Sequence, residues 1–129
     1  MNDVVATHEG GHAFVAVALG LLLDRVQIGD DPRYVLARGQ RSRRLDRVRV
    51  LMGGVAAEEI VFGGAVGGGT DDQQIADLLR DGDDEGALRA EVNRLLALNE
   101  GTVRYLAAKL ARHDTLTGDE VAALVRCRS

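Results

Sequence analysis

The sequence is poor in the residue types that stiffen or cross-link a small fold. Its 129 residues include one cysteine and one proline, so Cys127 has no partner for an internal disulfide bond. Aromatic residues make up only 3% of the chain, although 46% of the residues are hydrophobic. A core must therefore consist mainly of alanine, valine and leucine. A chain of this length buries such a core without cross-links, and we expect one domain over residues 1–129.

The chain also lacks a long hydrophobic run and an excess of basic charge. The longest apolar stretch runs from Ala13 to Leu23 and contains Gly20, whereas a membrane-spanning helix needs about 20 apolar residues. The formal net charge is −4 and the isoelectric point is about 5.3, which disfavours binding to nucleic acid. We therefore expect no nucleic-acid partner and no membrane insertion by this chain. A cytoplasmic location fits the single cysteine.

The hydrophobic pattern predicts a mainly α-helical fold. Two short alternating segments, 25–28 and 34–36, are separated by a Gly-Asp-Asp-Pro turn and predict a β-hairpin. The expected fold is a single helical domain of about five helices, with the small hairpin after the first helix. These helices are expected over 2–19, over 41–62, from a Thr70 cap to about Leu79, over 88–110 with a weak point at Gly101, and from a Thr117 cap to about Arg126.

The segment His8-Glu9-Gly10-Gly11-His12 has the residue types and spacing of a helical zinc site. Residues four apart lie on one face of a helix, so both imidazoles can point a nitrogen at one ion. Glu9, next to the first histidine, can take a proton from a water molecule on the metal, whose pKa zinc lowers to about 7. The two glycines each cost about 1 kcal/mol relative to alanine inside a helix, so close packing is the expected reason for them.

A catalytic zinc site needs a third protein ligand, which the motif does not supply. A metzincin arrangement is excluded because Ala18 stands where the third histidine would be. The remaining candidates are carboxylates on the second helix and after the glycine run. Spacing alone leaves four of them open: Glu58, Glu59, Asp71 and Asp72.

Three ordered blocks of the sequence resemble the peptidase domain of the FtsH-type (M41) family. His8-Glu9-Gly10-Gly11-His12-Ala13 is similar to its HEAGHA segment, and residues 53–63, GGVAAEEIVFG, are similar to its GGRAAEEIVFG segment. Gly68-Gly69-Thr70-Asp71-Asp72 resembles its GASND segment, with Asp72 on the aspartate. The chain from Val92 through Val121 also resembles the C-terminal helices of the family. The resemblance implies a mostly helical zinc peptidase.

The residues carried over by the resemblance are a Zn²⁺ site of His8, His12 and Asp72, with Glu9 as the catalytic base. Glu59 is then the alternative to Asp72, and Glu58 and Glu59 are expected to orient or neutralise the site. The implied function is a zinc-dependent metalloendopeptidase that hydrolyses unfolded proteins or peptides. The alternative is a catalytically inactive zinc-binding or interaction domain of the same fold.

The sequence departs from the family pattern in three respects. Gly10 replaces an alanine, the segments between the blocks are shorter, and no GxxxxGK phosphate loop of an ATPase occurs. We therefore expect hydrolysis that is independent of an ATPase or assisted by a partner. The expected partners are a polypeptide substrate and either further copies of the chain or a separate ATPase.

Overall fold

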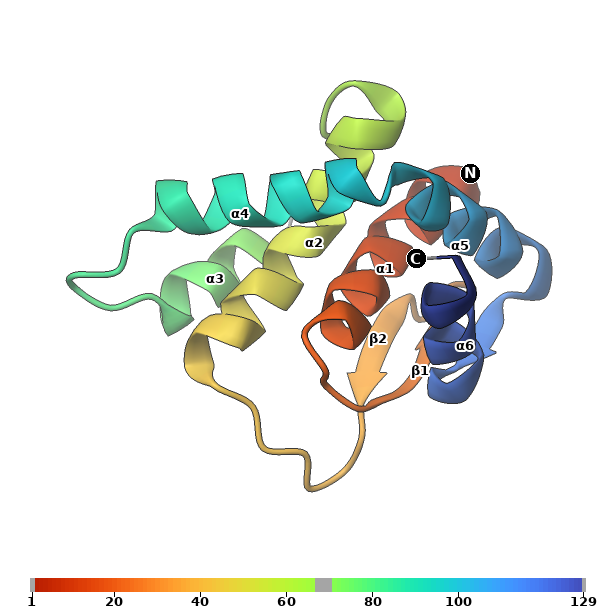
Figure 1. The fold of residues 1–129 in the computed structure, drawn as a ribbon, viewed down its shortest axis with the longest axis horizontal. Helices are drawn as coiled ribbons and strands as arrows, with labels where there is room; N and C mark the ends of the chain where they lie inside the picture. The colour runs from red at the N-terminus through yellow and green to blue at the C-terminus, as the bar shows by residue number, and fades with distance from the viewer. Residues whose placement is uncertain (1, 67–70, 129) are drawn as a thin grey trace.

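The computed structural model describes residues 2–66 and 71–128 (Figure 1). This part of the chain contains six helices and three short strands, so the fold is mainly α-helical as predicted. In chain order the elements are α1 (Asn2–Ala18), β1 (Leu23–Gln27), β2 (Arg33–Leu36), α2 (Arg44–Phe62), α3 (Asp71–Leu78), α4 (Glu85–Leu98), α5 (Glu100–His113), β3 (Thr115–Thr117) and α6 (Gly118–Arg128).

Helix α1 lies at the centre of the molecule and packs against α2 and α5, while α4 packs mainly against α2 and also contacts α1 and α5. Small side chains allow α1 and α2 to cross closely. A Cβ atom on Gly11 would lie only 2.2 Å from the backbone oxygen of Gly53. The close packing expected from the motif glycines is therefore present at Gly11. At Gly10 the nearest atoms would be 3.8 Å from a Cβ, which is an ordinary contact.

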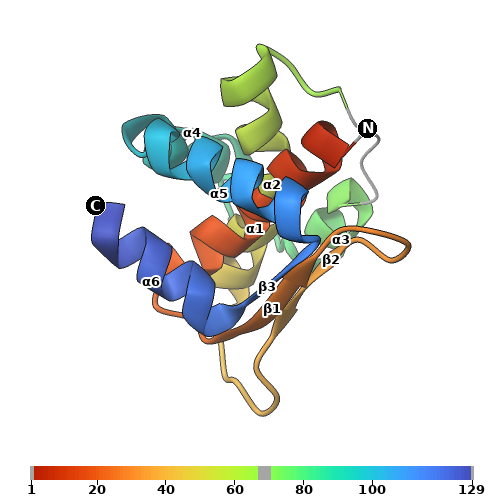
Figure 2. The same ribbon diagram turned by 90° about the vertical axis from the view of Figure 1, so that its right-hand side faces the viewer.

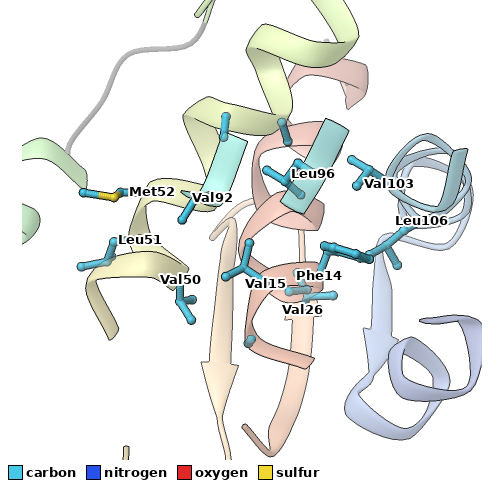
Figure 3. Close-up of a cluster of buried hydrophobic side chains, with 14 of the residues drawn as sticks. Phe14, Val15, Val26, Val50, Leu51, Met52, Val92, Leu96, Val103 and Leu106 are labelled. Atoms are coloured by element: carbon cyan, nitrogen blue, oxygen red, sulfur yellow. The ribbon is translucent and has the colours of Figure 1, made fainter. Parts of the chain in front are cut away.

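The core consists of aliphatic side chains with very few aromatics, as the composition requires. Phe14 and Val15 of α1 are 2% and 0% exposed, and they meet Val50 of α2, Leu96 of α4 and other aliphatic residues (Figure 3). Burial of each such side chain contributes about 1.5–3 kcal/mol relative to leaving it exposed. Because α1 is covered by this core on several sides, the backbone that carries the histidine motif is held rigidly.

The three strands form an antiparallel sheet in the order β2-β1-β3, with β2 at one edge (Figure 2). The hairpin of β1 and β2 is the predicted one, and Val26 pairs with Tyr34 across it. The third strand was not expected from the sequence. Thr115–Thr117 is too short to produce an alternating pattern, and its pairing with residues 25–27 of β1 defines it as a strand.

The predicted helix over 88–110 is two helices, because the chain leaves helical geometry at Asn99 (φ −124°, ψ 27°). The Asn99 side-chain amide donates to the carbonyl oxygen of Leu95 at 2.8 Å, and α4 ends at Leu98, three positions before the expected weak point at Gly101. This break accounts for the sixth helix. The cap predicted at Thr70 lies outside the described residues.

The capping box predicted before the last helix is confirmed. The Glu120 backbone N–H donates to Thr117 Oγ1 at 3.1 Å, and the Thr117 N–H donates to Glu120 Oε1 at 2.9 Å. Two backbone donors at the start of α6 are thereby satisfied. Among residues 2–66 and 71–128, no helix combines the length and the apolar character needed to cross a bilayer.

Candidate metal centre

Helix α1 presents both histidines of the motif on one face, as residues four apart on a helix require. The ring centroids of His8 and His12 are 4.7 Å apart and the ring planes are almost perpendicular, at 85°. His12 is 1% exposed, so its imidazole has little access to bulk water. Two nearly buried imidazoles at this distance need a shared partner between them.

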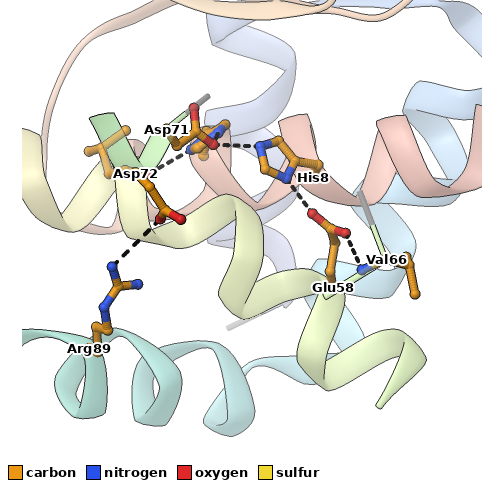
Figure 4. Close-up of polar contacts among 8 residues, drawn as sticks. His8, Glu58, Val66, Asp71, Asp72 and Arg89 are labelled. Carbon is orange, nitrogen blue, oxygen red and sulfur yellow. Dashed lines mark hydrogen bonds and ion pairs between the residues drawn. The ribbon is translucent and has the colours of Figure 1, made fainter. Parts of the chain in front are cut away.

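That partner is the side chain of Asp71, the first residue of α3. Asp71 Oδ2 lies 2.6 Å from His8 Nε2 and 3.1 Å from His12 Nε2 (Figure 4). The carboxylate oxygen and the two nitrogens all lie within 4.8 Å of one another. Three ligand atoms of the types that zinc prefers therefore converge on one point from two separate helices.

The other ring nitrogens, both Nδ1, are held from outside the centre. His8 Nδ1 donates to Glu58 Oε2 at 2.5 Å, and His12 Nδ1 donates to the carbonyl oxygen of Val50 at 2.7 Å. Glu58 is completely buried, and its other oxygen accepts the backbone N–H of Val66 at 2.9 Å. Such contacts orient imidazole ligands and direct the opposite nitrogen toward a metal. Of the two glutamates expected to orient the site, Glu58 is thus the one that contacts a histidine.

The donor set fits a zinc ion for two reasons. The Val50 carbonyl only accepts hydrogen bonds, so His12 Nδ1 carries the hydrogen, and in a neutral ring Nε2 presents a lone pair to the Asp71 carboxylate. Two electron-rich atoms in contact require a proton or a cation between them. In addition, Gly54 of α2 leaves the space around these atoms open, since a Cβ there would lie 2.6 Å from His8 Nε2 and 2.7 Å from His12 Nε2.

The charges of the centre are strongly coupled. Burial alone lowers the pKa of His8, but hydrogen bonds to Asp71 and Glu58 outweigh it and raise this pKa to about 9. Burial raises the pKa of Asp71, yet the hydrogen bonds from His12 and His8 hold it well below its usual range. A proton and a metal ion would therefore compete for the same nitrogen and oxygen atoms.

The side chain of Glu9 lines a cavity of about 500 Å³, together with His8, His12 and Tyr34. Burial raises the pKa of Glu9, while the two histidines oppose that shift. A carboxylate next to a metal centre with a raised pKa is suited to accept and return a proton near neutral pH. The structure thus places the predicted base in the same cavity as the predicted histidine ligands.

Tyr34 is a residue of this cavity that the sequence analysis did not single out. Its ring lies 4.8 Å from the His12 ring, with a tilt of 39°. Burial, together with the charges of Asp71 and Glu9, raises the pKa of Tyr34 to about 12. The sequence offered only a weak signal, namely a tyrosine in a strand that follows the histidine helix.

The structure does not bring Asp72 to the histidines. Its side chain is 72% exposed and lies 3.8 Å from Arg89 of α4, whereas the side chain of Asp71 is 11% exposed. The alternative, Glu59, is exposed on α2, and the buried carboxylate there is that of Glu58. The carboxylate that the structure places beside the histidines is thus that of Asp71, whereas the resemblance implies Asp72 as the third ligand.

The physical reason is helix geometry. Both aspartates belong to α3, and successive residues of a helix point about 100° apart, so only one can face the histidines. Ile75 is buried one turn after Asp71, which puts Asp71 on the side of α3 that faces the core. The spacing of Asp71 and Ile75 was the available signal, because they stand four positions apart and therefore share one face of a helix.

No family model matches the chain. Curated relatives named ATP-dependent zinc metalloprotease FtsH do match it. The relative from Lancefieldella parvula is 36% identical over 87 residues, which cover 55% of this chain and 13% of the relative. The one from Methylibium petroleiphilum is 42% identical over 103 residues, with 64% and 16% covered. FtsH 3 of Sphaerobacter thermophilus is 37% identical over 93 residues, with 60% and 18% covered.

These matches show that the chain contains a region related to FtsH, as the three sequence blocks indicate. The aligned parts span between 13% and 18% of the length of these relatives. The relation is thus to a family of zinc-dependent proteases and concerns a small portion of each member.

Proposed function

We propose that this FtsH-related chain is a zinc-dependent metalloendopeptidase that hydrolyses peptide bonds in unfolded proteins or peptides. One observation carries the proposal: the Nε2 atoms of His8 and His12 converge on the same carboxylate oxygen of Asp71, at 2.6 and 3.1 Å. Three protein ligands beside an open cavity are the arrangement of catalytic zinc sites, which keep one position free for water or substrate.

In this proposal His8, His12 and Asp71 hold the zinc ion. The hydrogen bonds from His8 to Glu58 and from His12 to the Val50 carbonyl keep both rings aimed at it. When bound, zinc supplies Lewis acidity, which polarises a peptide carbonyl group and makes a water molecule more acidic. The fixed rings contribute by holding this arrangement without reorganisation during the reaction.

Glu9 acts as the general base and acid. Its carboxylate accepts a proton from the attacking water molecule and then donates that proton to the amine that leaves. The position supports this role, because Glu9 directly follows His8 on α1 and lines the same cavity. Its raised pKa, caused first by burial, brings proton transfer closer to neutral pH.

The proposed substrate is an unfolded polypeptide, and the proposed partners are further copies of the chain or a separate ATPase. The cavity of about 500 Å³ takes a few residues of an extended chain rather than a folded domain. The relatives are named as ATP-dependent proteases. A folded substrate would therefore need to be opened before this site reaches it.

The central test replaces Glu9 by glutamine, which keeps the size of the side chain and removes its basicity. We expect Glu9→Gln to bind zinc in the same ratio as the original protein and to lose hydrolysis of casein by at least about 100-fold. Zinc content and cleavage are measured on the same preparation. Equal cleavage by both proteins would show that Glu9 is not the base, and zinc binding without cleavage by the original protein would favour a catalytically inactive zinc domain.

A matched pair of substitutions tests the third ligand. Asp71→Asn is expected to reduce zinc affinity by at least about 100-fold, since it removes a charged ligand. Asp72→Asn is the control, because it makes the same chemical change one residue away on an exposed side chain. A loss of zinc in the Asp72 variant with retention in the Asp71 variant would return the assignment to Asp72.

A further inference from the structure

We propose that the hydroxyl group of Tyr34 donates a hydrogen bond to the carbonyl oxygen of the peptide bond being cleaved, as that oxygen gains negative charge. The proposal rests on the proposed peptidase function and adds to it a catalytic residue outside the histidine motif. Tyr34 keeps its own proton throughout, so the role is electrostatic stabilisation by a positioned donor.

The position of Tyr34 is the first argument. It lies on the edge strand β2, where it pairs with the buried residue Val26 of β1. Its ring rests against His12, with a centroid separation of 4.8 Å. The strand pairing fixes the backbone of Tyr34, the imidazole of His12 contacts its ring, and Tyr34 lines the cavity that also contains Glu9 and Asp71.

The availability of the hydroxyl group is the second argument. No hydrogen bond joins it to another residue of the ranges 2–66 and 71–128, and no buried polar side-chain atom in these ranges lacks a partner. The Tyr34 hydroxyl is therefore open to the cavity rather than buried without a partner. A phenol is a neutral donor at physiological pH. The Tyr34 hydroxyl group, without an acceptor among these residues, can therefore donate to a ligand.

The other hydrogen-bond donors that line the cavity are either exposed to solvent or already engaged. Arg33 has a side chain that is 54% exposed and is paired with Asp31 at 3.2 Å, so it is directed toward solvent. Gln74 is exposed on α3. The two histidines direct one nitrogen to an outer acceptor and the other to the metal position. Of the side chains that line this cavity in the described ranges, Tyr34 alone combines a fixed ring with an unused donor.

The test uses Tyr34→Phe, which keeps the ring against His12 and removes only the hydroxyl group. We expect kcat for a fluorogenic peptide to fall by about 10²–10³-fold, as for the loss of one oxyanion donor, with KM and zinc content unchanged. Tyr105→Phe is the matched control, because Tyr105 is the other tyrosine and is exposed on α5. A kcat within twofold of the original for Tyr34→Phe would overturn the proposal.

A second measurement does not depend on turnover. A peptide phosphinate, which imitates the tetrahedral state but is not cleaved, is titrated by calorimetry into the zinc-loaded protein. We expect Tyr34→Phe to bind it at least about tenfold more weakly than the original, and equal affinity would overturn the proposal. If the original cleaves no peptide but this difference is found, the proposed function fails and the hydrogen bond stands. Absence of phosphinate binding to the original protein would overturn both.

Discussion

Gly54 leaves free the space in which the Nε2 atoms of His8 and His12 lie. It lies on α2 opposite the histidine face of α1, where helix propensity alone would favour alanine by about 1 kcal/mol. A Cβ atom at this position would lie 2.6 Å from His8 Nε2 and 2.7 Å from His12 Nε2. The substitution Gly54→Ala therefore places a methyl group where the ligand atoms are.

The size of the effect follows from these distances. Ordinary contacts between heavy atoms are about 3.5 Å or longer, so each ring must withdraw by roughly 0.8–1 Å. Zinc–nitrogen bonds are about 2.0–2.1 Å long with little tolerance, and a withdrawal of this size removes the ligand geometry. We expect zinc affinity to fall by at least about 100-fold, which corresponds to about 2.7 kcal/mol.

The fold should survive Gly54→Ala, because the atoms that must give way are the ends of two side chains. Zinc affinity is measured by competition with a chromophoric chelator, and the free energy of unfolding of the metal-free protein is measured in urea. Gly10→Ala is the control, since a Cβ there would lie 3.8 Å from its nearest neighbours. We expect it to bind zinc as the original does and to unfold with a free energy higher by about 1 kcal/mol.

Two outcomes would refute this reasoning. Zinc affinity of Gly54→Ala within threefold of the original would mean that the Nε2 atoms do not hold the metal as the structure arranges them. An equal loss of affinity in Gly10→Ala would mean that any alanine in these helices disturbs the site, and the argument from distances would then fail.

Three further predictions concern packing, protons and capping. Gly11→Ala should lower the free energy of unfolding in urea by about 1–3 kcal/mol, because its Cβ would lie 2.2 Å from the Gly53 backbone oxygen, which cannot move aside; greater stability would contradict the close crossing. Zinc uptake at pH 7 should release a proton, since the pKa of His8 is raised to about 9 and the ring is protonated before binding; identical binding heats in two buffers of different ionisation enthalpy would contradict it. Thr117→Ala should reduce the unfolding free energy by about 1 kcal/mol through loss of the capping box, and an unchanged urea midpoint would show that the cap contributes nothing.

Much of the fold was predictable because its elements have local causes. The helix over 2–19 and the hairpin after it follow from hydrophobic periodicity and turn residues. The structure places α1 at Asn2–Ala18, and β1 and β2 are the next elements along the chain. The capping box at Thr117 is equally local, and its two hydrogen bonds are present. Periodicity did not locate the break at Asn99, because the apolar pattern continues through it and a single side-chain hydrogen bond ends the helix.

The candidate site also has one part that local sequence predicts and one part that it does not. His8, Glu9 and His12 are recognisable from five consecutive residues, since their spacing on one helix is enough to bring them together. The aspartate is more than 50 positions away, and choosing between two adjacent aspartates depends on the rotation of α3 about its axis. Packing of Ile75 against the core sets that rotation, so it is a property of the assembled helices.

The sequence by itself determined which residues of the candidate site share one helix: a pair of histidines one turn apart, a carboxylate beside the first of them, and two glycines between them. These features depend on residue type and on spacing within one helix. Only the tertiary structure decided that Asp71 faces the histidines, that Glu58 orients His8, and that Tyr34 from the edge strand reaches the same cavity. Each of these three contacts joins elements distant in the chain, so each depends on the packing of α1 against its neighbours.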